Sequence, residues 1–167
     1  QTDKTFFELL RTSLIAAFDR VQREQRQRRR NEQITALHKW SRDLIAATTR
    51  DDVAEIAVEA ARKVLDHDSC GVYFAQEDGR LVPSAVQFAE TVTLSPPDAP
   101  TFDYDSIAWD VYDSGEEYLT DDVREDPRRY NPETEFRSEL VLPLDSYGVG
   151  LFGSTEAGVF DGVDQSV

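Results

Sequence analysis

Trp109 to Gly153 is the stretch that decides the fold, and it contains in order VYDSGE (111–116), YLTDD (118–122), SELVLPL (138–144) and GVGLFG (148–153). The apolar spacing predicts a helix over 105–114 that ends at Gly115, because glycine is favoured where a helix terminates. A short strand at 117–120 and an irregular segment follow. Two apolar strands, at 138–144 and 149–155, then close a sheet as a hairpin.

The residues before this stretch predict one helix and a further strand hairpin. Residues 49–52 supply N-capping oxygens ahead of apolar residues that run at helical spacing from Val53 to Leu65. Strands at 69–75 and 81–88 flank a turn made by Glu77, Asp78 and Gly79. The predicted fold class is therefore α+β, an antiparallel sheet with flanking helices.

A long helix is predicted at the N-terminal end, because residues 5–49 contain neither Gly nor Pro. Apolar residues at 3-4-3-4 spacing form a seam on one face of this helix. Its principal members are Leu10, Leu14, Val21, Ile34, Leu37 and Leu44. Residues 22–33 interrupt the seam, and Ile34 falls one position short of the register set by Val21, which argues against one regular coiled coil.

A seam of this kind requires a partner, and a parallel homodimer is the natural one. The basic block 26–30, which contains four arginines and one glutamine, offers an alternative function in binding RNA, DNA or lipid. Solvated linker helices often have the same composition.

Length and composition are those of one domain with an appendage, since the chain has 167 residues of which 40% are hydrophobic. No apolar run approaches the ~20 residues of a membrane span, and no signal-peptide pattern is present. The chain begins at Gln1 and contains no Met, so we expect a fragment of a longer protein. Its single cysteine fits a reducing compartment, and we expect a cytoplasmic location.

Charge is distributed unevenly along the chain. Residues 1–50 carry a net charge of +5 and residues 51–167 carry −20, which gives −15 in total. The acidic part repels nucleic acid and anionic lipid, so we expect no nucleic-acid binding there. Only three of the 18 basic residues are lysines, a composition typical of cytoplasmic proteins of salt-loving archaea. An ordinary acidic surface is the alternative.

The order of these elements resembles that of a GAF domain, a small sensor and dimerisation module of signalling proteins. The resemblance covers about residues 34–167. The segments that carry it are 49–65, 70–74, 113–123, 142–153 and 160–164. The closest resemblance is to archaeal regulators with tandem sensor domains, among them bacterio-opsin-activator-like proteins, sensory histidine kinases and transducer-like proteins.

The resemblance implies a GAF domain over 34–167 that lacks the usual last helix. Residues 1–33 would then be a signalling or linker helix. Residues 1–10 resemble the beginning of a closing GAF helix, so we interpret the segment as the last helix of an upstream domain joined to a connecting helix. Alternatively, residues 1–25 fold back, or cross to a partner, and fill the vacant place.

The residues that would support catalysis or a cofactor are few, so we expect no enzyme. Cys70 is the only cysteine, which excludes the multi-cysteine methionine-sulfoxide chemistry of some GAF proteins. His38 and His67 are too few for a histidine-rich metal site, and we predict none. Haem ligation by His67 is an alternative to a solvated helix end. Cyclic-nucleotide and bilin signatures are absent from the sequence, so no cofactor is assigned.

The resemblance also implies a ligand pocket between the sheet and the segments that cover it. The positions matching its walls are Tyr73, Ala85, Phe88, Trp109, Tyr112, Tyr118, Phe136 and Ser138. Such aromatic walls favour a flat or apolar ligand with a few polar groups. The alternative is that these side chains only fill the core.

The sequence thus predicts a non-catalytic regulatory module in a multidomain signalling protein. A small-molecule or redox signal received by the GAF domain would change how the N-terminal helices pack in a dimer. The alternative is a scaffold that dimerises without any ligand.

Overall fold

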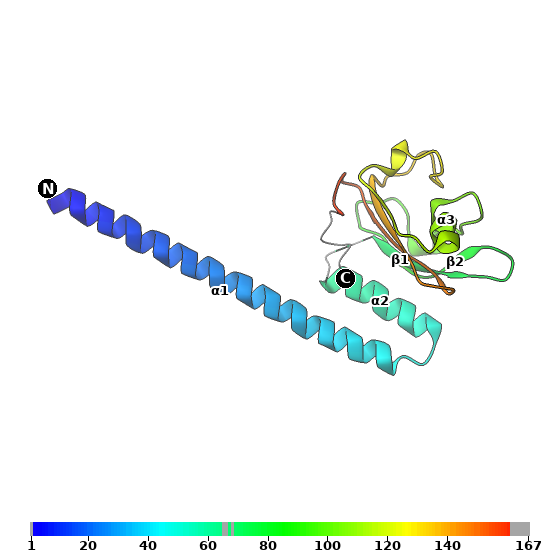
Figure 1. Cartoon of the computed structure of the whole chain (residues 1–167), viewed down its shortest axis with the longest axis horizontal. Coiled ribbons are helices and arrows are strands. Elements are labelled where there is room, and N and C mark those ends of the chain that lie inside the picture. Colours follow the sequence, from blue (N-terminus) through cyan, green and yellow to red (C-terminus); the bar gives the residue numbers. More distant parts are fainter. Residues whose placement is uncertain (1, 65–66, 68, 161–167) are drawn as a thin grey trace. The chain divides into compact units, whose positions relative to one another are not determined.

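The computed structural model describes residues 2–64, 67 and 69–160, and the chain divides into two compact units, residues 1–41 and 42–167. The first unit belongs to α1 (Thr2–Ala46), a single helix of 45 residues that continues past Ser41 (Figure 1). At 1.5 Å per residue it is about 65 Å long. The predicted long N-terminal helix is confirmed, with bounds of Thr2–Ala46 in place of the predicted 5–49.

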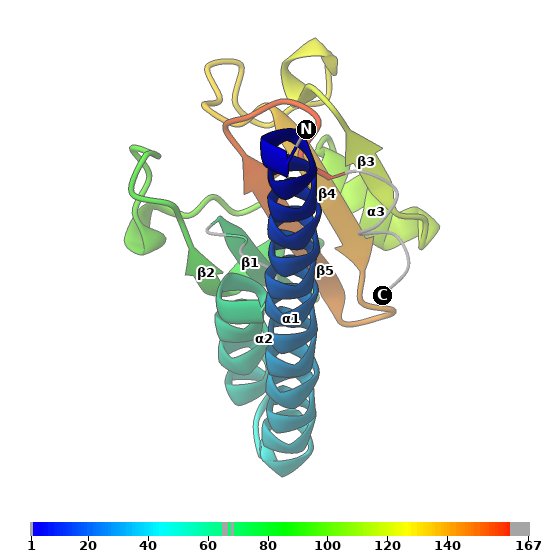
Figure 2. The same ribbon diagram turned by 90° about the vertical axis from the view of Figure 1, so that its left-hand side faces the viewer.

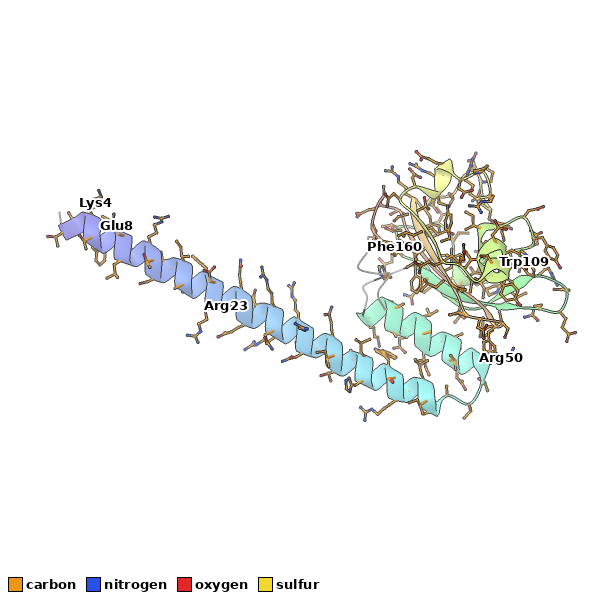
Figure 3. The ribbon with its side chains drawn as sticks, viewed as in Figure 1. Lys4, Glu8, Arg23, Arg50, Trp109 and Phe160 are labelled. Carbon is orange, nitrogen blue, oxygen red and sulfur yellow. The ribbon has the colours of Figure 1, made fainter. Side chains whose placement is uncertain are left out.

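The helix α1 runs without interruption through residues 22–33, where the apolar seam is absent. Gln, Arg and Glu have high helix propensity, so this segment needs no apolar face to remain helical. An ion pair one turn apart, between Arg20 Nε and Glu24 Oε1 at 3.0 Å, spans the start of this segment. Figure 3 shows Lys4, Glu8 and Arg23 projecting from this helix. None of the described helices is both long and apolar enough to cross a membrane.

The second unit contains one five-stranded antiparallel sheet with strand order β2-β1-β5-β4-β3 (Figure 2). The strands are β1 (Cys70–Ala75), β2 (Leu81–Gln87), β3 (Tyr118–Thr120), β4 (Ser138–Pro143) and β5 (Gly148–Ser154). Helix α2 (Arg50–Val64) lies on one face and α3 (Ile107–Ser114) on the other (Figure 1). The predicted α+β class, antiparallel sheet and flanking helices are confirmed.

A reciprocal cap fixes the start of α2. The backbone N–H of Asp52 donates to Thr49 Oγ1 at 3.1 Å, and the Thr49 N–H donates to Asp52 Oδ2 at 3.0 Å. Hydrogen bonds from the Thr49 side chain and backbone to its carboxylate lower the pKa of Asp52. The predicted cap is thus a capping box with Asp in the place of Glu.

The buried face of α2 consists of small and β-branched residues. Ala54, Val58 and Ala61 pack against Cys70 and Val72 of the sheet. Small side chains let the helix approach the strands closely, so a tight core layer forms on this face.

A second core layer covers the opposite face of the sheet. Tyr73, Val141 and Val149 of the strands meet Ile107 and Val111 of α3. The cap of α3 positions this helix: Ser106 Oγ accepts from the Trp109 N–H at 3.2 Å. At the other end Gly115 adopts φ 70°, and its N–H donates to the Val111 carbonyl at 2.9 Å. Gly115 thus ends the helix as predicted.

The β4–β5 hairpin depends on Gly148. Its φ is 154°, and a Cβ at this position would collide with the carbonyl oxygen of Tyr73. No end of a strand lies more than one residue from its predicted position. Helix α3 starts two residues later than predicted, because Ser106 is its N-cap. The predicted end of α2 at Leu65 and the predicted helix cap after Phe160 lie outside the described residues.

Leu81→Ala tests the α3-side core. Leu81 is fully buried in it, and its backbone pairs with Phe102. We expect the free energy of unfolding in urea to fall by about 2–5 kcal/mol, because the cavity left behind adds to the lost burial. Leu144→Ala is the matched control, since Leu144 is 37% exposed. Equal losses in the two variants would contradict this placement of the core.

Candidate functional site

A cavity of about 520 Å³ opens on the α3 face of the sheet. Its volume lies in the range of small-molecule sites. Apolar side chains from α3, the strands and the loops make up much of its lining: Phe102, Ile107, Ala108, Val123, Phe136 and Leu151. Six ionisable residues also line it: Arg129 and Glu139 are half-buried, whereas Asp98, Tyr130, Glu133 and Glu135 are exposed.

Successive side chains of β4 and β5 point to opposite faces of the sheet, which places every second residue on the α3 face. Glu139 and Val141 point to the α3 face, and Val141 pairs with Leu151 of β5. Glu139 pairs with Gly153, where a Cβ would lie only 2.8 Å from Phe136 Cδ1. The missing side chain at Gly153 therefore makes room for the Phe136 ring in the pocket wall.

Two loops that contribute to the wall are joined by a clasp, which we define as Thr93 with Glu135. The Thr93 N–H donates to Glu135 Oε2 at 2.8 Å, and its hydroxyl donates to Glu135 Oε1 at 2.9 Å. Both residues line the pocket. A bidentate contact between residues 42 positions apart fixes the distance between these loops.

Arginine–carboxylate pairs fasten the segment that carries Arg129. Arg128 Nη1 donates to Asp110 of α3, and its Nη2 donates to Asp126, each at 2.8 Å. Arg137 Nη2 donates to Asp122 at 3.0 Å, and Arg124 Nη2 donates to the same carboxylate at 2.8 Å. The segment is thus tied to α3 and to the start of β4.

Asp126 also accepts from the Tyr118 hydroxyl at 2.9 Å. The hydrogen bond from Arg128 lowers the pKa of Asp126 to about 2 despite partial desolvation. Burial, and then the hydrogen bond to Asp126, raise the pKa of Tyr118 to about 12. At neutral pH this carboxylate is therefore ionised and the phenol neutral.

The Arg129 guanidinium has fewer hydrogen-bond partners than those of its neighbours. Its Nη1 donates to the backbone carbonyl of Asp126 at 3.1 Å. Its Nε–H is buried and meets no acceptor among the residues that the structure describes. A buried N–H without an acceptor costs about 1–3 kcal/mol, so an acceptor at this position would stabilise the site.

Glu139 is the other ionisable group of the pocket wall. Burial, and then the negative charge of Asp126, raise its pKa from 4.5 to about 7. No hydrogen bond joins its carboxyl to another side chain within the described part of the chain. The Glu139 carboxyl is therefore a half-buried acceptor to which none of the described side chains donates.

Of the residues predicted for the pocket wall, Phe136 lines the cavity. Tyr73 is buried in the core below it, with its ring 5.0 Å from that of Phe102. Tyr118 is bonded to Asp126, and Phe88 lies 6.4 Å from Phe136, ring to ring. These three lie on the pocket side of the domain without lining the cavity.

The remaining four predicted residues lie away from the cavity. Trp109, labelled on α3 in Figure 3, contacts Tyr112 with ring centroids 5.2 Å apart. Ala85 packs in the α2 layer, on the opposite face of the sheet. Ser138 is adjacent to Glu139 on β4, so its side chain faces the opposite side of the sheet. Its buried hydroxyl donates to the Glu156 carbonyl at 2.7 Å.

The side chains considered for redox or metal chemistry lie elsewhere. Cys70 is buried beside Val58 on the α2 face. His67 packs against Phe160, with ring centroids 5.0 Å apart. Within residues 2–64, 67 and 69–160, no three His, Cys, Asp or Glu side chains gather as a metal site would require.

Replacing Glu139 by Gln tests the site through pH. Because folding raises this pKa, its contribution to stability is complete below pH 4.5 and is lost as the pH rises to about 7. The unfolding free energy of E139Q relative to wild type should therefore rise by about 2–3 kcal/mol between pH 4 and pH 8. Glu117→Gln, at an exposed position, controls for the loss of one carboxyl. A pH-independent difference for E139Q contradicts the prediction.

Comparisons with known proteins agree with this architecture. A family model described as "GAF domain" matches residues 47–167. The fold resembles the GAF domain of a phosphoenolpyruvate-protein phosphotransferase from Coxiella burnetii, with TM-score 0.67, 16% identity and coverage of 80% of this chain and 84% of that one.

Two further solved structures are similar. One is free methionine-R-sulfoxide reductase from Neisseria meningitidis in complex with its substrate, with TM-score 0.66, 18% identity and 77% of each chain covered. The other is the A. aeolicus nlh2 GAF domain in an inactive state, with TM-score 0.60, 14% identity and coverage of 82% of this chain and 85% of that chain. No curated protein matches in sequence. The family match over residues 47–167, on this fold, establishes that the chain belongs to the GAF family.

Proposed function

We propose that this chain is a sensory module of a signalling protein and that it binds a small molecule in the cavity on the α3 face. The observation that carries the proposal is the cavity itself, of about 520 Å³, in which apolar side chains are accompanied by the half-buried Arg129 and Glu139 and by exposed acids such as Asp98 and Glu133. Small-molecule sites combine an apolar lining with a few placed polar groups in this way.

Family membership supports this role, because GAF domains are typically sensory or regulatory modules of signalling proteins. Some structural neighbours are enzymes or parts of enzymes, such as the sulfoxide reductase. The described residues that line this cavity include no cysteine or histidine, so they offer no thiol nucleophile or imidazole base. We therefore propose binding without catalysis.

The response to a ligand would pass through a homodimer formed by α1. Its six seam residues are each between 37% and 50% exposed: Leu10, Leu14, Val21, Ile34, Leu37 and Leu44. A second copy of the chain is the occupant that a repeating seam fits best. Occupation of the pocket would then bias the packing of the two helices. A dimerisation scaffold without a ligand is the alternative.

The proposed organisation keeps residues 1–33 as the signalling helix, with the GAF domain following from 34. The acidic, lysine-poor composition supports a cytoplasmic protein of a salt-loving archaeon. In this proposal the neighbouring domains of the full protein carry the output.

A panel of metabolites tests the pocket by thermal unfolding. A ligand at 100 times its dissociation constant stabilises the protein by about 2.7 kcal/mol, which raises Tm by about 5–10 °C. Leu94→Trp adds bulk at the cavity wall and should abolish the shift.

Leu144→Trp is the matched control, because Leu144 has nearly the same exposure as Leu94 and does not line the cavity. It should respond like wild type. If no compound shifts Tm, or if L94W responds fully, sensing in this pocket is refuted and the scaffold alternative gains support.

Leu14→Glu tests the dimer. Leu14 lies in the middle of the N-terminal part of the seam, and a charge there would be desolvated against the partner helix. We expect the dimer dissociation constant in sedimentation equilibrium to rise at least about tenfold. Thr12→Glu, on the opposite side of α1, should change it little. A monomeric wild type, or equal effects of the two variants, would contradict the proposal.

A further inference from the structure

We propose that the pocket selects a small zwitterion with an apolar body, whose carboxylate binds the Arg129 guanidinium and whose amine donates to Glu139. This inference rests on the proposed function and adds the chemical class of the ligand. It follows from which charges in the domain are already paired and which are not.

Arg129 differs from its neighbours in the same segment. Arg124, Arg128 and Arg137 each hold a carboxylate at 2.8–3.0 Å. Arg129 has only a backbone carbonyl as acceptor, and its buried Nε–H has none within the described residues. Arginine recognises carboxylates through parallel N–H···O bonds. A ligand carboxylate is the acceptor that this guanidinium lacks.

Charge explains why the ligand should carry more than a carboxylate. Residues 51–167 have a net charge of −20, so their field opposes the entry of a small anion. A zwitterion has no net charge and avoids this repulsion. It can still present a carboxylate to Arg129 once it is bound.

Glu139 supplies the complementary acceptor. Its carboxyl lines the cavity and receives no side-chain hydrogen bond from the described residues. A buried carboxylate without donors is unfavourable, and an ammonium group beside it relieves that cost through a charge-assisted hydrogen bond. Glu139 would thus bind the amine of the ligand, and Arg129 would bind its carboxylate.

The rest of the wall determines the ligand body. Phe102, Phe136 and Leu151 offer two aromatic rings and one branched side chain to the cavity. An apolar or aromatic side group would be buried against them, which favours amphiphilic amino acids over small polar ones.

Three compounds with one shared phenyl body separate these contributions. L-phenylalanine carries both charges, 3-phenylpropanoate only the carboxylate, and 2-phenylethylamine only the amine. In calorimetric titrations of the whole chain at pH 7, we expect phenylalanine to bind at least tenfold more tightly than either analogue. Leucine, 4-methylpentanoate and 3-methylbutylamine form a second series with an aliphatic body.

Matched variants connect each preference to one residue. Arg129→Gln should remove the advantage of phenylalanine over the amine, and Glu139→Gln should remove its advantage over the acid. Arg124→Gln is the control, because Arg124 is paired with Asp122 and does not line the cavity. It should keep the full preference. Circular dichroism establishes that each variant is folded before titration.

The outcomes separate this inference from the proposed function. If neither series shows a preference for the zwitterion, or if R129Q and E139Q keep it, the ligand class is overturned. The proposed function survives that result when another metabolite raises Tm in wild type and not in L94W. It fails, together with this inference, when no compound of any class binds.

Discussion

A sheet with two apolar faces must be covered on both, and here the two coverings differ in kind. Helix α2, with 15 residues, lies along one face and closes it with small side chains. Helix α3 has only eight residues, so loops complete the other covering. Loops bring to this face polar and charged groups that the buried alanine and valine side chains of α2 do not supply. The pocket lies on the face that α3 covers only in part and that loops complete.

The loops hold their positions through charge as well as through the apolar burial of Phe102 and Val123. Arg128 joins Asp126 to Asp110 of α3, and Thr93 holds Glu135 across the gap between two loops. Isolated surface ion pairs contribute little, whereas pairs that share partners restrict geometry together. Among the half-buried ionisable residues of the cavity wall, Arg129 and Glu139 keep hydrogen-bonding capacity that the described residues do not fill. The proposed specificity depends on that capacity.

The architecture could be predicted well because helix caps and turns depend on neighbouring residues in the sequence. Gly115, the Thr49–Asp52 cap and the Gly-containing hairpin turn each act through neighbouring residues, and the structure places them as expected. The site was harder to predict. Strand β4 reads as a continuous apolar run after Glu139, so alternation did not reveal that Glu139 faces the pocket while Ser138 faces away. The only signal was a lone acid at the start of an apolar strand.

Arg129 lies in a turn-rich segment without any periodic pattern, and its pairing is decided by long-range contacts that a sequence does not display.

The most direct test is a map of amide chemical-shift changes when the most stabilising metabolite is added to the labelled chain. The account predicts changes concentrated on β4, on residues 93–94 and on residues 123–136. Changes centred on α2 and its face of β1, with those segments unaffected, would contradict a binding site on the α3 face.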